Sequence, residues 1–124
     1  MNIYQEHILD LYKHPNNFGT LENPTNKFHI NNPLCGDDMT IQLKIEDNII
    51  KEVKFSGQGC AISMASSSML TDKIKGMSVK DINNIKNEDV IKMLQIPISH
   101  IRMKCALLCL DAVKGALNDK DKQI

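Results

Sequence analysis

The feature that most constrains the fold is a pair of alternating apolar runs on either side of a turn. In the first run, residues 39–46, every second residue is apolar, and in the second, Ile49, Val53 and Phe55 share one face. Because side chains alternate between the two faces of a strand, each run predicts a half-buried β-strand. Asp47-Asn48 between the runs is typical of a two-residue hairpin turn. The sequence therefore predicts an antiparallel hairpin with one face on the core and the other in water.

Helical spacing of apolar residues surrounds this hairpin. It predicts helices over residues 2–13, about 60–75, 79–85, 88–95 and about 99–118. A short strand is expected near 27–30 and a frayed tail over 119–124. The order of helix, strands and then helices predicts an α+β fold, with helices on one face of a small antiparallel sheet.

Four local signals set the expected ends of these elements. Ser78 and Asn87 are the predicted N-caps of the two short helices, and Gly76 is the predicted end of the helix before them. The stretch Ser56-Gly57-Gln58-Gly59 is expected to break the second strand of the hairpin.

The composition excludes several classes of protein. A chain of 124 residues with 42% hydrophobic and 24% charged residues predicts one globular domain spanning 1–124. Fifteen basic residues balance fifteen acidic ones and aromatics are only 4%, so no nucleic-acid partner is expected. No apolar run is long enough to cross a membrane and the N-terminus does not resemble a secretory signal, so we expect a cytoplasmic protein with no membrane partner.

Three of the four cysteines are expected at related places in this fold. Cys35 precedes the first long strand, Cys60 lies where a glycine-rich break meets a helix start, and Cys105 lies early in the last helix. If these ends pack together, three thiols and the carboxylate of Asp37 converge. Soft sulfur ligands select zinc, copper(I) or iron–sulfur clusters, and the positive end of a helix favours thiolate at Cys60. An aspartate oxygen holds soft iron more weakly than sulfur does, so such a site can open.

The alternative reading is that these cysteines only pack, since free cysteine is among the most buried residue types. We favour packing for Cys109, which lies one helical turn after Cys105. A reserve-ligand or sulfur-relay role for Cys109 stays open. His100 is the best spare ligand among the four histidines, because it is near Cys105 in sequence.

Four segments resemble the signatures of the U-type iron–sulfur scaffold family, which includes IscU, SufU and the N-terminal domain of NifU. They are Tyr12-Lys13-His14-Pro15-Asn16-Asn17-Phe18-Gly19, Asn32-Pro33-Leu34-Cys35-Gly36-Asp37, Gly57-Gln58-Gly59-Cys60-Ala61-Ile62-Ser63-Met64-Ala65-Ser66-Ser67-Ser68 and Arg102-Met103-Lys104-Cys105-Ala106-Leu107-Leu108. The resemblance covers nearly the whole chain. It implies a SufE/NifU-like fold in which a three-stranded antiparallel sheet is packed by helices.

The same resemblance implies a function and a set of site residues. The protein would receive sulfur from a cysteine desulfurase, build a labile [2Fe–2S] cluster, and pass it to apo iron–sulfur proteins or carrier proteins. Cys35, Asp37, Cys60 and Cys105 match the family's ligands, and Cys105 matches its usual persulfide acceptor. Self-association as a homo-oligomer is left open.

Two departures from the IscU pattern leave an alternative function open. Lys104 stands where IscU has a histidine, as in SufU, and it could activate Cys105 or pair with Asp37. Residues 98–102 lack both prolines of the family's chaperone-recognition stretch, so a dedicated Hsp70 partner is not supported. The SufU-like features favour, as the alternative, a zinc-dependent sulfurtransferase that accepts and relays persulfide sulfur. A purely structural zinc domain is the third hypothesis.

Overall fold

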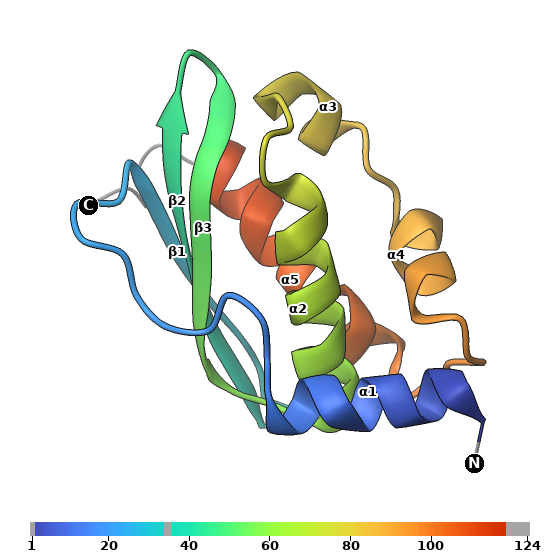
Figure 1. Ribbon diagram of the computed structural model, residues 1–124. Coiled ribbons are helices and arrows are strands. Elements are labelled where there is room, and N and C mark those ends of the chain that lie inside the picture. The colour runs from blue at the N-terminus through green and yellow to red at the C-terminus, as the bar shows by residue number, and fades with distance from the viewer. Residues whose placement is uncertain (1, 34–35, 119–124) are drawn as a thin grey trace.

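The computed structural model describes residues 2–33 and 36–118, and in it every helix lies on the same face of a three-stranded sheet (Figure 1). The strands are β1 (Asn26–Asn32), β2 (Asp37–Glu46) and β3 (Ile49–Gln58), and each is antiparallel to its neighbour in the order β1-β2-β3. The predicted fold class is therefore confirmed.

The hairpin between β2 and β3 forms for the reasons that the alternation predicts. Asp47 and Asn48 both take positive φ, at 54° and 62°, and this backbone shape suits the right-handed twist of the strands that they join. The alternate residues Met39, Ile41 and Leu43 are fully buried under the helices. The sheet thus has one face on the core.

The predicted inner face of β3 is wrong at the start of the strand. Ile50 is fully buried whereas Ile49 is only half-buried, because the pairing of β3 with β2 shifts between Lys44 and Ile45. Such a β-bulge places one extra residue on one strand and so changes which residues face the core, and local alternation does not display it.

The described residues also form five helices: α1 (Ile3–Lys13), α2 (Ala61–Ile74), α3 (Val79–Asn83), α4 (Asn87–Leu94) and α5 (Met103–Asn118). Helices α2 and α5 pack on the sheet and on each other, and α1 crosses near the start of α2 (Figure 1). The serines of α2 let it approach α5 closely, since the buried hydroxyl of Ser66 donates to the carbonyl of Ala106 at 2.6 Å. Close packing, rather than nucleophilic chemistry, is thus the role of this hydroxyl.

The predicted strand break at residues 56–59 is wrong, because β3 continues to Gln58. Gly57 pairs with Met39, and a β-carbon at position 57 would overlap the carbonyl oxygen of Asp38. The glycine permits close approach of two backbones, which is a recognised reason for glycine inside a strand. The first strand is also longer than predicted, since pairing with β2 extends it to seven residues.

Two predicted helix starts are also corrected. The last helix begins at Met103 rather than near Ser99, because the hydroxyl and carbonyl of Ser99 both accept from the backbone N–H of Arg102 and close a separate turn. Lys86, not Asn87, is the N-cap of α4, where the carboxylate of Asp89 accepts from the Lys86 N–H at 2.8 Å. Ser78 is confirmed as the N-cap of α3.

The far ends of α2, α3 and α4 test the remaining boundary predictions. Gly76 is confirmed as the residue after the C-cap of α2, with a φ of +82°. Helix α3 ends at Asn83, two residues earlier than predicted, and α4 ends one residue early because Gln95 takes a left-handed conformation. The predicted frayed tail, 119–124, lies outside the described residues. No helix in the described ranges is long and apolar enough to span a membrane.

Candidate metal centre

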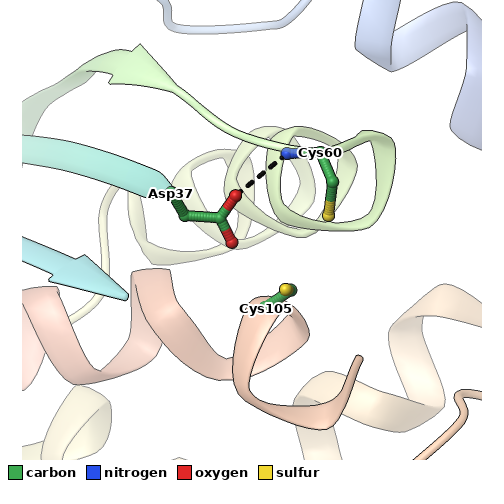
Figure 2. Close-up of side chains that lie close together, drawn as sticks. All are labelled: Asp37, Cys60 and Cys105. Carbon is green, nitrogen blue, oxygen red and sulfur yellow. Dashed lines mark hydrogen bonds between the residues drawn. The ribbon is translucent and has the colours of Figure 1, made fainter. Parts of the chain in front are cut away.

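The starts of β2, α2 and α5 lie at the same end of the molecule, and each contributes one side chain to a common site (Figure 2). A carboxylate oxygen of Asp37 and the sulfur atoms of Cys60 and Cys105 all lie within 4.8 Å of one another. Asp37 and Cys105 are buried, at 2% and 0% exposed, whereas Cys60 is partly exposed. The structure therefore brings together three of the four predicted ligands. Cys35, the fourth, lies outside the described residues.

The first turn of α2 orients two of these ligands. Cys60 is the N-cap of the helix, and its sulfur accepts from the backbone N–H of Ser63 at 3.5 Å. The Cys60 N–H in turn donates to Oδ1 of Asp37 at 3.1 Å. The unpaired N–H groups of a helix start attract negatively charged groups, which makes this position a favourable one for metal-ligating side chains. This confirms the predicted placement of Cys60 at a helix N-terminus.

The second oxygen of Asp37 is the clearest sign that this group of residues suits a cation. Oδ2 is buried, and among the described residues it has no hydrogen-bond partner. Figure 2 shows this oxygen on the side of the carboxylate away from the Cys60 N–H. A buried carboxylate oxygen without a donor is costly, and a metal ion removes the cost. Two sulfur atoms and one oxygen are a donor set that suits zinc or iron, so these residues fit a metal or an iron–sulfur cargo.

Arg102 is a site residue that the sequence analysis did not single out. Its exposed guanidinium hydrogen-bonds toward the sulfurs of Cys60 and Cys105, and the negative charge of these groups, chiefly that of Cys60, raises the pKa of Arg102. The available signal was its position three residues before Cys105, which places it one turn away. A fixed positive charge beside two sulfur ligands offsets the negative charge that thiolates bring to a loaded site.

The structure separates the three predicted auxiliary residues from the site. Cys109 is fully buried, and burial raises its pKa to about 12, so it is a packed thiol as favoured from the sequence. Lys104 is exposed and shares a cleft of about 300 Å³ with Asp111, and no ion pair joins it to Asp37 in the described part of the chain. His100 is exposed in the turn before α5 and does not belong to the ligand cluster found among the described residues. The predicted pairing of Lys104 with Asp37 is therefore wrong, because its side chain lies in that cleft instead.

Comparisons with known proteins agree with this geometry. The family model of the NifU-like N terminal domain matches residues 3–124. The chain is 37% identical over 123 residues to iron sulfur cluster assembly protein 1 of Trachipleistophora hominis, covering 97% of this chain and 88% of that one. It is also 37% identical over 125 residues to the iron–sulfur cluster assembly scaffold protein IscU of Haemophilus influenzae, covering 97% and 98%.

Solved structures give the same answer for the fold. A SufU protein from Fervidobacterium islandicum, a candidate iron–sulfur cluster assembly scaffold for the SUF system, aligns with a TM-score of 0.78 at 27% identity and covers 91% of this chain and 95% of its own. The N-terminal part of a NifU-like protein from Brucella abortus has the same fold, with a TM-score of 0.78 at 21% identity, covering 98% and 96%. The chain therefore belongs to the NifU-like N-terminal domain family.

Proposed function

We propose that this protein is a scaffold on which a labile [2Fe–2S] cluster is assembled and then passed to apo iron–sulfur proteins or carrier proteins. The observation that carries the proposal is the meeting of the Asp37 oxygen with the sulfurs of Cys60 and Cys105 within 4.8 Å. The shared family with IscU-named relatives supports it. Cys35 is the proposed fourth ligand on the strength of its motif.

The mixed donor set explains how such a cluster could leave again. Three thiolates hold iron firmly, whereas a carboxylate oxygen is a harder and weaker partner for it. The aspartate position is therefore the point where solvent or the thiolate of an acceptor protein can enter. Partial exposure of Cys60 keeps one side of the site open to such an acceptor.

Sulfur would come from a cysteine desulfurase, with Cys105 as the proposed acceptor. The Cys105 thiolate attacks the outer sulfur of the donor's persulfide, a new S–S bond forms, and the donor cysteine leaves as a thiolate. Because Cys105 is fully buried, this step requires local opening around the start of α5. Mass spectrometry after incubation with a desulfurase and cysteine should find the persulfide in Cys60→Ser and not in Cys105→Ser. The opposite pattern would move the acceptor role to Cys60.

The experiment that tests the scaffold is anaerobic reconstitution with iron and sulfide. It should give visible charge-transfer absorption from the wild-type protein, and Asp37→Ala should lose its cluster more slowly because the labile oxygen ligand is gone. Absorption and chelator-induced decay measured side by side report both results. A colourless reconstituted wild type would end the scaffold proposal.

A zinc-dependent sulfurtransferase is the second candidate function. The observation that favours it is the lysine at position 104, where IscU has a histidine and SufU-type sequences have a lysine. Lys104 lies outside the ligand cluster, so no histidine ligand adjoins Cys105. This function requires about one tightly held zinc with four ligands. Metal-free protein that still stimulates a desulfurase would exclude it.

The hypothesis of a structural zinc domain can be tested on the same samples. The apolar core between the sheet and α2 and α5 is extensive without any metal, so removal of metal by a chelator should not unfold the chain. Unfolding on chelation would instead favour a structural role for zinc. The cytoplasmic location and the absence of a dedicated Hsp70 partner stay predictions from the sequence. Self-association stays an open question.

A further inference from the structure

Two oxygen atoms near the metal centre lie close to the point that a β-carbon of Gly59 would occupy. A β-carbon built on Gly59 would lie 2.9 Å from Oγ of Ser63 and 3.1 Å from Oδ1 of Asp37. The hydroxyl of the first turn of α2 and the carboxylate of the metal centre thus face the same point from different elements. A side chain at position 59 would press against both groups, so glycine leaves both of them in place.

The hydroxyl of Ser63 is the exception among the buried hydroxyls of α2. Ser66 donates to the carbonyl of Ala106, Ser67 to that of Ser63 and Thr71 to that of Ser67, at 2.6 to 2.8 Å. Ser63 is only 1% exposed, yet its Oγ has no partner among the residues that the structure describes. An unpaired buried hydroxyl costs stability, and its presence calls for a reason such as a role in another state of the molecule.

We propose that Ser63 is a positioning residue that donates a hydrogen bond to the Asp37 carboxylate and so makes this aspartate a labile ligand. The inference rests on the proposed metal centre and assigns a role within it. A carboxylate accepts several hydrogen bonds, and Oδ1 already takes one from the Cys60 N–H. Rotation of the Ser63 side chain toward Asp37 would add a second donor. Each donor draws charge away from the metal bond, and together they hold the carboxylate once it has turned from the metal.

Zinc binding in a double-mutant cycle tests this role without depending on cluster assembly. Ser63→Ala should bind zinc about three- to tenfold more tightly than wild type in competition with a chromophoric chelator, the effect of one lost hydrogen bond. In the Asp37→Ala background the same substitution should change zinc affinity by less than about twofold, because its target is absent. Zinc release to excess chelator should slow in the single variant in the same proportion.

Ser67→Ala is the matched control, since it removes a buried hydroxyl from the same helix face one turn away and should leave zinc affinity unchanged. Alanine is smaller than serine and a better helix former, so Ser63→Ala should keep the fold. Ser63→Gly removes the same hydroxyl in a second variant, and circular dichroism compares the folds. An unchanged affinity in both Ser63 variants, or an equal effect with and without Asp37, would overturn the role of Ser63. A wild type that binds neither zinc nor a cluster would instead overturn the metal centre itself.

Discussion

Gly57→Ala tests how the strand pairing places the metal centre. The residue takes a φ of +117°, and its β-carbon would overlap the carbonyl oxygen of Asp38 and lie 2.9 Å from that carbonyl's carbon. Backbone strain in this region costs about 1–3 kcal/mol and overpacking costs about 1–3 kcal/mol. We therefore expect the free energy of unfolding to fall by about 4 kcal/mol, a large share of the roughly 5–15 kcal/mol typical of a domain. Relief of the clash would open β2 from β3 beside Asp37.

Urea unfolding followed by circular dichroism measures the loss, and zinc affinity reports displacement of the carboxylate. Gly76→Ala is the control, because Gly76 also has positive φ, at +82°, but nothing lies within 4 Å of its β-carbon position. That variant should lose only about 1–2 kcal/mol and bind zinc normally. If the two variants lost the same stability within about 0.5 kcal/mol, close approach to Asp38 would not be the reason for glycine at position 57.

Two further predictions concern the charge and the thiols around the site. Arg102→Ala should weaken zinc binding about two- to fivefold at low salt, since it removes a positive charge near two thiolates. The effect should shrink in 0.5 M salt and largely vanish in Arg102→Lys. A salt-independent loss would refute the electrostatic explanation. Cys109 should resist alkylation in the folded protein while Cys60 reacts. Because burial raises the Cys109 pKa from 9.0 to about 12, its stabilising contribution is complete below pH 9 and is lost as pH rises toward 12. Between pH 8 and 10.5 wild type should therefore lose about 2 kcal/mol more stability in urea than Cys109→Ala, and parallel losses would contradict the pKa.

Local periodicity explains why the hairpin and most of the helices could be predicted. The alternation over residues 39–46 and the Asp47-Asn48 turn depend on neighbours in sequence, which a single sequence displays. The failures concern contacts between distant segments. Gly57 signals a break in isolation, but its role depends on the Asp38 carbonyl across the sheet. Serine is a common residue type at helix starts, but Ser99 closes a separate turn instead.

The metal centre follows the same division. Cys60 and Cys105 could be predicted because thiols at helix starts carry a chemistry that few other residue types share. Arg102 and Ser63 could not, since arginine on a surface and serine on a helix are common without any function. The roles proposed for them depend on the direction in which their side chains face, and the packing of α2, α5 and β2 sets that direction.

The hydrogen bond from the Cys60 N–H to Asp37 joins the N-cap of α2 to the carboxylate that we propose as the labile ligand. The environment of the Cys60 amide proton should therefore change when the Asp37 carboxylate gains or loses a metal, and no attached probe is needed to detect this. In a ¹⁵N-labelled sample, its chemical shift and its exchange with deuterated water would follow loading and unloading at a single position. If the proposed function is right, a single bond at the start of a helix therefore reports whether the site is occupied.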